Sequence, residues 1–358
     1  MPRSARSCQP VAALGSVHRV TFQSYGAMFE RPTLQSHVDA IFGRPPDQGI
    51  TLAMVVMHRG EIVAERYGIQ PANVFEPERK LDADSTLISW SIAKSITHAA
   101  CGILVRDGVL DLERPAAVPE WKGTEKETIT VLDLLEMRPG LRFVEDYVDG
   151  ETSHCIAMLF GEGSGDHAAY AAALPLDHPP GTVWNYSSGT TNIVCRLLGD
   201  IVGGGRDGME EFLRERLFGP AGMRAAVPKF DDAGTWVGSS YVYATAGDFA
   251  RFGELYRHDG VTAGGDRILP AGWADHGRTK VAHEPTDDVP SGFDYGRHWW
   301  MWPDFAGSLA AHGYEGQYVV VVPDRELTVV HLGKTPAEQR RHVVKGFDAL
   351  IRHVEVTA

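Results

Sequence analysis

Residues 317–333 read QYVVVVPDRELTVVHLG, two runs of β-branched residues broken by a proline-led turn at 323–325. β-Branched residues favour strands and proline favours turns, so this stretch predicts a β-hairpin. Residues 50–68, ITLAMVVMHRGEIVAERYG, contain a similar pair of runs that meet at Arg59-Gly60. Strands joined by tight turns are antiparallel, so we expect one antiparallel sheet to which both ends of the chain contribute.

Helical patterns occupy the middle of the chain. Apolar residues recur at helical spacing in residues 91–105, and shorter segments with helical character lie at 33–42, 130–133, 192–202 and 246–257. Near the C-terminus, Thr335, Pro336 and Glu338 fit a capping box with proline at the first helical position. A final amphipathic helix is therefore expected to begin there.

This order of elements predicts an α+β fold. We expect an antiparallel sheet flanked by helices, built from residues 1–85 and 285–358, with residues 86–284 inserted as a mostly helical domain. The active site is expected in the cleft between these two parts.

Composition excludes several classes of protein. The 358 residues are 43% hydrophobic and 23% charged, which is typical of a folded soluble protein. The net charge of −13 argues against a nucleic-acid partner, since binding to a phosphate backbone needs clustered cations. The sequence has no run of 18 or more apolar residues, so no membrane span is expected.

The first residues of the chain do not resemble an export signal. Residues 1–30 lack a clean periodicity and a continuous apolar stretch, so we expect them to cover the surface and the protein to be cytoplasmic. The four cysteines form no Cys-x-x-Cys pair, which favours reduced thiols over a disulfide scaffold or structural zinc. They are Cys8, Cys101, Cys155 and Cys195.

The sequence lacks two common hydrolase motifs and contains a glycine-rich cofactor pattern only in an unfavourable context. The sequence has neither His-Glu-x-x-His nor Gly-x-Ser-x-Gly, so a metalloprotease and an α/β-hydrolase are both disfavoured. Residues 203–208 fit a Gly-x-Gly-x-x-Gly pattern, but they follow a helical stretch and are expected to form a loop between helices. We therefore expect no metal and no organic cofactor.

Residues 88–95, ISWSIAKS, carry the most informative chemistry. Ser91 and Lys94 are three residues apart at the start of a predicted helix, so their side chains share one face. A serine is a poor nucleophile until a base removes its proton, and a partly desolvated lysine can be that base. The helix N-terminus adds N–H groups for a developing oxyanion. An ordinary amphipathic helix would fit the same residues.

Two later segments complete a candidate constellation. Tyr186 lies in a polar turn before a predicted helix, where it either anchors the turn or faces a cleft. We expect a nearby lysine ammonium to favour its phenolate, which would make it a competent base. Residues 311–316, AHGYEG, lead into the C-terminal hairpin and either form a simple strand entry or supply a second oxyanion N–H.

In this order and context, the three segments resemble the motifs of the serine β-lactamase and penicillin-recognising superfamily. The resemblance is greatest to its class C-like esterase branch and to 6-aminohexanoate-dimer hydrolases. It covers most of the chain after residue 50 and includes TVLDLLEMRPGLRFVEDY (130–147), YVYATAGDFARFGELY (241–256) and YGRHWWMW (295–302). The implied fold is β-lactamase-like.

The resemblance also implies roles for individual residues. Ser91 would be the nucleophile, Lys94 its proton acceptor, and Tyr186 the group that passes the proton to the leaving group. The oxyanion hole would consist of the backbone N–H groups of Ser91 and of Tyr314, which follows Gly313.

A second set of residues is implied to contact the substrate. Tyr147 resembles an aromatic residue that some relatives hold over the substrate, and Trp90 stands beside the nucleophile. Trp299, Trp300 and Trp302 either face the cleft or belong to the core. The substrate-binding set is therefore Trp90, Tyr147, Ser188, His312 and Gly313.

The sequence departs from the superfamily's motifs at two positions. Ser188 stands where asparagine is usual, and Ala311-His312-Gly313 stands where Lys-Thr-Gly is common. An imidazole is a poorer fixed cation than an ammonium, which argues against efficient β-lactam hydrolysis.

A serine hydrolase of small carboxylic esters or linear amides is therefore the expected function. The alternatives are a β-lactamase or D,D-peptidase, and a catalytically inactive relative that binds a ligand. The expected partner is the small-molecule substrate, without nucleic acid or membrane, and a homodimer remains an open alternative.

Overall fold

The computed structural model describes residues 33–73, 77–286 and 289–356. Residues Thr33–Ala358 form one compact unit. The expectations for residues 1–30, including Cys8, lie outside the described residues.

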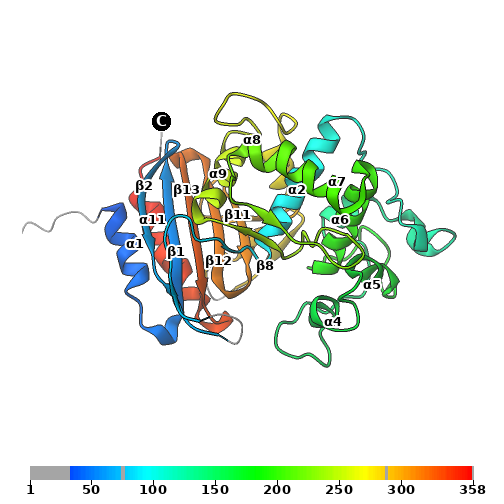
Figure 1. Ribbon diagram of the computed structural model, residues 1–358, viewed down its shortest axis with the longest axis horizontal. Coiled ribbons are helices and arrows are strands. Elements are labelled where there is room, and N and C mark those ends of the chain that lie inside the picture. The colour runs from blue at the N-terminus through cyan, green and yellow to red at the C-terminus, as the bar shows by residue number, and fades with distance from the viewer. Residues whose placement is uncertain (1–32, 74–76, 287–288, 357–358) are drawn as a thin grey trace, which may run out of the picture. The chain divides into compact units, whose positions relative to one another are not determined.

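An eight-stranded sheet combines both ends of the described chain, and every neighbouring pair of strands is antiparallel (Figure 1). The order across the sheet is β2-β1-β13-β12-β11-β10-β9-β8. Both predicted hairpins are confirmed, and the fold class is the predicted one. The strands are β1 (Ile50–His58), β2 (Glu61–Tyr67), β8 (Ala282–Glu284), β9 (Phe293–Tyr295), β10 (Trp300–Met301), β11 (Leu309–Gly313), β12 (Gln317–Val322) and β13 (Leu327–Lys334).

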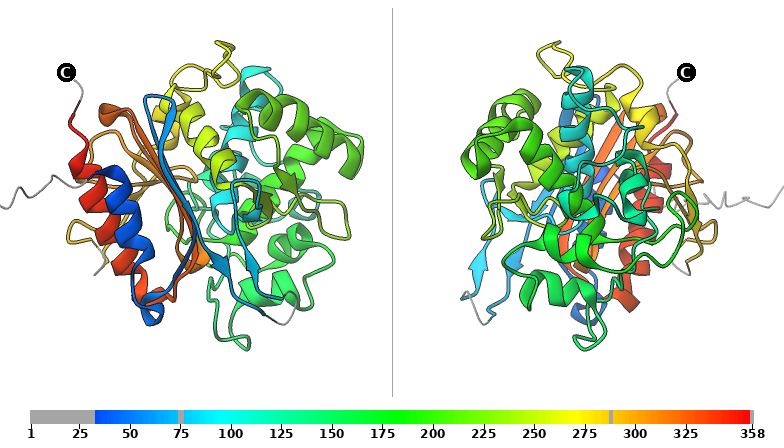
Figure 2. Two further views of the ribbon diagram at one scale, coloured as in Figure 1. Left: turned by 60° about the vertical axis from the view of Figure 1, so that its left-hand side comes forward. Right: turned by 90° about the vertical axis from the view of Figure 1, so that its right-hand side faces the viewer.

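The central strands are apolar on both faces because both faces are covered. Val55 of β1 and Val319 of β12 belong to one apolar cluster, whereas Val56 and Val320 belong to another on the opposite face. Helices α1 (Leu34–Phe42) and α11 (Arg340–His353) pack side by side on one face, and α9 (Ala246–Arg257) covers the other (Figure 2). Side chains alternate along a strand, so a continuous β-branched run supplies two cores at once.

Most of the predicted helices are present at the expected places. Residues 91–105 correspond to α2 (Ile92–Arg106), and Thr130 caps α3 (Val131–Leu135) through a capping box. The loop predicted at residues 203–208 is confirmed only for Gly203 and Gly204, because α7 already begins at Gly205. The remaining helices are α4 (His154–Phe160), α5 (His167–Ala173), α6 (Ser188–Val202), α7 (Gly205–Phe212), α8 (Gly219–Ala221) and α10 (Trp273–Gly277), with a π-helical segment at Leu213–Phe218.

In the described segments, five short strands lie outside the large sheet. β3 (Ile69–Gln70) pairs with β4 (Arg79–Lys80). The others form a small sheet in the order β5-β7-β6, and they are β5 (Leu87–Ile88), β6 (Val227–Pro228) and β7 (Val242–Ala244). β5 ends just before Ser91, so this small sheet positions the turn that carries the candidate nucleophile.

The predicted start of the last helix is wrong. Pro336 is extended, with ψ 148°, and a 3₁₀ turn at Ala337–Gln339 follows it. α11 itself begins at Arg340 and has no side-chain cap. A capping box read from residue types needs helical geometry directly after the cap, and that geometry is absent here.

The division of the chain at residues 85/86 and 284/285 and the cytoplasmic location stay predictions. In the part of the chain that the structure describes, no helix combines the length and apolar character that crossing a bilayer requires.

Helix α9 lies against the sheet through Gly253, and this close contact can be tested. A Cβ atom at Gly253 would lie 2.5 Å from Cγ2 of Thr328 and 3.2 Å from Cγ1 of Val319, two stiff β-branched side chains. We expect Gly253→Ala to lower the free energy of unfolding by about 1–3 kcal/mol through overpacking. In α6, Gly199 has open space around the same position, so Gly199→Ala should raise stability by up to about 1 kcal/mol. Denaturant unfolding of both variants checks this, and a stabilised Gly253→Ala protein would contradict it.

Candidate active site

A sharp turn presents Ser91 at the start of α2. Trp90 has a positive φ of 43°, which reverses the chain between β5 and the helix. Ser89 anchors the turn, because its Oγ donates to the carbonyl of Ser240 and accepts from the N–H of Val242, both at 3.0 Å. The Ser91 hydroxyl makes no capping hydrogen bond to the helix, so it is available for chemistry.

Lys94 is buried beside Ser91 and has three oxygen partners. Its Nζ lies 2.8 Å from Ser91 Oγ, 2.9 Å from Ser188 Oγ and 3.0 Å from the carbonyl oxygen of Ser239. Its exposed fraction is only 1%. Burial lowers the pKa of Lys94 below its usual value, because an ammonium loses its hydration there. The lowered pKa makes the neutral amine, which a general base requires, easier to form.

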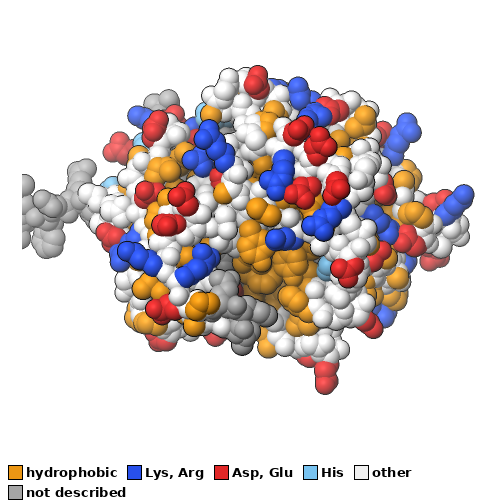
Figure 3. All heavy atoms as spheres, in the orientation of Figure 1, with side chains coloured by type: hydrophobic (Ala, Val, Ile, Leu, Met, Phe, Trp, Pro, Cys, Tyr) orange, Lys and Arg blue, Asp and Glu red, His pale blue; other side chains and the backbone are white. Residues whose placement is uncertain are grey.

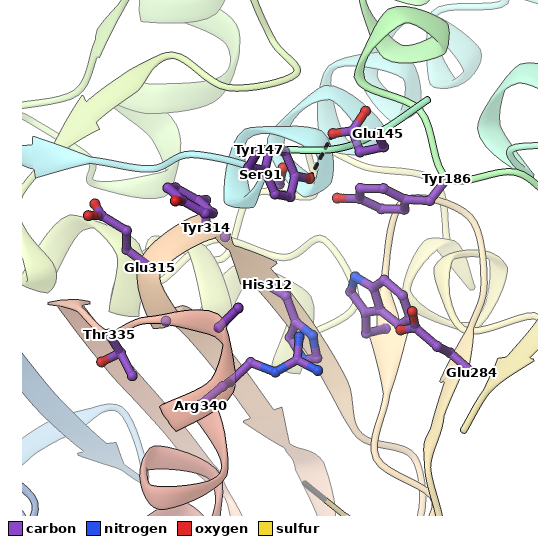
Figure 4. Close-up of a pocket in the computed structure, with 14 residues that line it drawn as sticks. Ser91, Glu145, Tyr147, Tyr186, Glu284, His312, Tyr314, Glu315, Thr335 and Arg340 are labelled. Atoms are coloured by element: carbon purple, nitrogen blue, oxygen red, sulfur yellow. Dashed lines mark hydrogen bonds between the residues drawn. The ribbon is translucent and has the colours of Figure 1, made fainter. Parts of the chain in front are cut away.

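Tyr186 comes from the loop before α6 and points toward Ser91 (Figure 4). Lys94 Nζ lies 4.9 Å from the centroid of its ring. Burial raises the pKa of Tyr186 above its usual value, the Glu145 carboxylate adds to the rise, and a hydrogen bond with Ser91 opposes it. The expectation that Lys94 favours the phenolate is therefore wrong. The phenol keeps its proton and is suited to donate it.

The end of β11 approaches the nucleophile turn at Gly313. A Cβ atom at Gly313 would lie 2.6 Å from the carbonyl oxygen of Ser89, so only glycine allows this distance. Tyr314 comes next and lines the same pocket as Ser91. Within the described turns and loops, the N–H groups of Ser91 and Tyr314 donate to no backbone carbonyl. Two N–H groups that share a pocket with the nucleophile are what an oxyanion hole requires.

Ser91 stands between two pockets that differ in character. The larger has a volume of about 280 Å³ and is lined by Tyr186, Trp300 and the charged residues Glu284, Glu315 and Arg340. The smaller, about 70 Å³, is mostly apolar and is lined by Trp90, Tyr314 and the α4 residues Cys155, Ile156, Leu159 and Phe160. A space-filling view of the face drawn in Figure 1 shows a hollow where hydrophobic side chains gather (Figure 3).

Comparison with known proteins agrees with this geometry. The Beta-lactamase family model matches residues 38–351. The chain belongs to the beta-lactamase family. A curated relative, the 6-aminohexanoate-dimer hydrolase of Paenarthrobacter ureafaciens, is 26% identical over 328 residues, in an alignment that covers 85% of this chain and 79% of that protein.

Two further similarities extend this comparison. Penicillin-binding protein 4 of Amycolatopsis lactamdurans is 27% identical over 312 residues, covering 76% of this chain and 74% of that protein. The crystal structure of a family VIII carboxylesterase superposes with a TM-score of 0.65 at 15% identity, covering 88% of this chain and 97% of the other. The family is one of serine hydrolases. The carboxylesterase shares the fold of this chain.

The two departures from the usual beta-lactamase motifs have structural consequences. Ser188 contacts Lys94 directly, so the shorter side chain still reaches the base. His312 stacks on Trp300, with ring centroids 5.3 Å apart and planes 7° apart. Burial lowers the pKa of His312, and the nearby Arg340 lowers it further, so the imidazole is neutral. A permanent cation does line this pocket, but it is Arg340 from α11.

Glu145 is the residue that the sequence analysis missed. It lines the larger pocket and accepts hydrogen bonds from the Ser188 Oγ at 2.6 Å, the Ser188 N–H at 2.7 Å and the Tyr147 hydroxyl at 2.8 Å (Figure 4). Residues i and i+2 of an extended segment face the same side. The signal for Glu145 in the sequence is its position two residues before Tyr147.

The other predicted residues divide between the pockets and the core. Trp90 and Tyr147 line the smaller pocket, and Trp300, His312 and Gly313 line the larger. Trp299 and Trp302 are 0% and 1% exposed, so they belong to the core. The described residues contain no group of three His, Cys, Asp or Glu side chains that could hold a metal ion.

The close approach at Gly313 can be tested by adding one carbon. We expect Gly313→Ala to push β11 away from the Ser89 carbonyl and to slow fluorophosphonate labelling of Ser91 by about 10- to 100-fold, the cost of a 1 Å misplacement. Gly264→Ala is the control, since the nearest atom there is at an ordinary 3.6 Å. Labelling rates from intact-protein mass spectrometry report the effect, and a wild-type rate in Gly313→Ala would refute this role for the glycine.

Proposed function

We propose that this protein is a serine hydrolase of carboxylic esters or linear amides that forms an acyl-enzyme on Ser91. The observation that carries the proposal is the convergence of three groups, with Lys94 Nζ 2.8 Å from Ser91 Oγ and 4.9 Å from the Tyr186 ring centroid. A buried amine with a lowered pKa is a competent base for a serine hydroxyl.

The proposed reaction has two balanced steps. Ser91 Oγ attacks the carbonyl carbon while Lys94 accepts its proton, and the negative oxygen is held by the N–H groups of Ser91 and Tyr314. The bond to the leaving group breaks as Tyr186 donates its proton to the departing oxygen or nitrogen, and Tyr186 regains a proton from Lys94. Water then attacks the acyl-enzyme by the same route and releases the acid.

The two pockets support an assignment of the substrate's halves. Tyr186 must reach the departing atom, and it lines the larger pocket but not the smaller one. The leaving group therefore belongs in the larger pocket, where Glu284, Glu315 and Arg340 suit a polar or charged alcohol or amine. The acyl group belongs in the smaller apolar pocket, whose volume of about 70 Å³ suits a chain of a few carbon atoms.

A β-lactamase or D,D-peptidase is the second candidate. Arg340 supports it, because a fixed cation in the larger pocket suits a carboxylate on the leaving side. The similarity to a penicillin-binding protein supports it as well. Nitrocefin turnover much faster than ester turnover would favour this candidate over the ester or amide hydrolase.

The nucleophile and its base can be tested directly. We expect wild-type protein to hydrolyse p-nitrophenyl butyrate, Ser91→Ala to fall to the uncatalysed rate, and Lys94→Ala to lose about 10²- to 10⁴-fold in turnover, as befits a general base. Release of p-nitrophenol measures all three. Equal, slow hydrolysis by wild type and Ser91→Ala would instead indicate a catalytically inactive, ligand-binding relative.

The acyl pocket makes a separate prediction about chain length. We expect acetyl to butyryl esters to react faster than octanoyl esters. Phe160 lines this pocket and is 64% exposed, and we expect it to limit longer chains. Phe160→Ala is then expected to raise octanoyl turnover relative to butyryl turnover by about 10-fold, about what one or two buried methylenes contribute.

A matched control separates pocket shape from surface hydrophobicity. Val109→Ala removes an apolar side chain that is 57% exposed and outside both pockets, so the chain-length profile should stay as in wild type. A Phe160→Ala profile that changes with the alcohol's length and not with the acyl length would reverse the assignment of the two pockets.

A further inference from the structure

Glu145 makes no hydrogen bond to Ser91 or Lys94. Through Ser188, it nevertheless restricts the direction of the hydrogen bonds that Lys94 makes, including the one with Ser91. Its two carboxylate oxygens accept four hydrogen bonds, two of them from the side chain and backbone of Ser188 and the others from the Tyr147 hydroxyl and, at 3.7 Å, the Cys155 thiol. A serine hydroxyl has one proton, and the 2.6 Å hydrogen bond to Glu145 uses it. Toward Lys94, the Ser188 oxygen can therefore only accept.

This restriction extends to the protons of Lys94. The Ser239 carbonyl can only accept, so Lys94 must donate one proton there and one to Ser188. A neutral amine has two protons and one lone pair. With both protons engaged, the lone pair faces its third partner, Ser91 Oγ at 2.8 Å. That direction is the one a general base needs to accept the serine proton.

We propose that Glu145 is a positioning residue that holds the Ser188 hydroxyl as an acceptor and so aims the Lys94 lone pair at Ser91. The inference rests on the proposed function and extends it to a residue that touches neither reacting group. Its conservative test is Glu145→Gln, which has nearly the same shape.

The amide of a glutamine cannot replace this carboxylate. The Ser188 N–H cannot rotate, so the single amide oxygen should turn toward it, which leaves the NH₂ group facing Ser188 Oγ. The hydroxyl then becomes the acceptor of that NH₂ and turns its own proton away from residue 145. Lys94 Nζ lies 2.9 Å from Ser188 Oγ, and a hydrogen bond from Ser188 to its lone pair competes with Ser91.

The charge of Glu145 predicts a second, independent effect. Burial lowers the pKa of Lys94, and the Glu145 carboxylate opposes that shift, so removing the carboxylate lowers the pKa further. The neutral amine then persists to lower pH, and the acidic limb of the rate profile moves to lower pH in Glu145→Gln. The variant leaves the other titratable groups that interact with Lys94 unchanged. These groups are Cys155, Cys195, Tyr186 and His298.

A double-mutant cycle tests the proposal without knowledge of the natural substrate. The probe is an alkyl fluorophosphonate, in which Ser91 Oγ forms a bond to phosphorus, fluoride leaves, and Lys94 takes the serine proton. We expect Glu145→Gln to slow the labelling rate, measured on the plateau of the pH–rate profile, by about 10- to 100-fold. In a Ser188→Ala background, Glu145→Gln should slow the labelling rate by less than about 3-fold, because residue 188 then has no hydroxyl that can reorient.

Controls distinguish this role from a structural one. Glu151→Gln removes the same charge from an exposed position of the same loop and should leave the rate and its pH profile unchanged. Glu145→Asp retains the carboxylate and should recover most of the rate. Thermal unfolding midpoints of all variants verify that each is folded.

The outcomes separate this proposal from the proposed function. An equal cost of Glu145→Gln in both backgrounds, an unshifted acidic limb, or a Glu145→Asp protein as slow as Glu145→Gln would each overturn the role of Glu145. Wild-type protein that takes no label at Ser91 would overturn the proposed function and this inference with it.

Discussion

The burial of one amine, that of Lys94, is the constraint on which the site depends. An ammonium is costly to bury, and a neutral amine is tolerated only when its N–H groups find acceptors. Three oxygens supply the contacts, and they come from α2, from the first residue of α6 and from the loop before β7. Helices and loops far apart in sequence are thereby held to one point, and the lowered pKa of the amine follows from the same burial.

The large sheet supplies the fixed frame for that point. Its central strands are covered on both faces, so β11 is held rigidly where it meets the nucleophile turn. Close approaches at Gly253 and Gly313 leave no room for a methyl group, which limits how far the helices and the strand end can move. Such rigidity suits a site whose electrostatics must be organised before the substrate binds.

The departures from the usual family motifs alter the surroundings of Lys94 and leave Lys94 itself in place. A serine in the second motif is short, and Glu145 supports it from the loop before α4. A neutral, stacked His312 occupies the third motif, while the positive charge of the larger pocket comes from Arg340. Ser91, Lys94 and Tyr186 thus stand at the motif positions, and the residues around them differ.

The two hairpins, most helices and the spacing of Ser91 and Lys94 could be predicted from the sequence, because each depends on neighbours within a few residues. The start of α11 could not, since residue types around Thr335 fit a cap that the extended Pro336 does not allow. The protonation state of Tyr186 could not be predicted from the sequence either. A nearby positive charge suggests the phenolate, but burial raises the pKa of Tyr186 and favours the phenol.

By itself, then, the sequence determined the hairpins that pair into the sheet, most of the helices and the identity of the candidate reactive residues. Only the tertiary structure decided how each candidate is surrounded. It brought Glu145 to Ser188, assigned Trp299 and Trp302 to the core, and separated an apolar pocket from a charged one. The physical reason is that local periodicity depends on adjacent residues, whereas burial and hydrogen-bond direction depend on groups that approach only after folding.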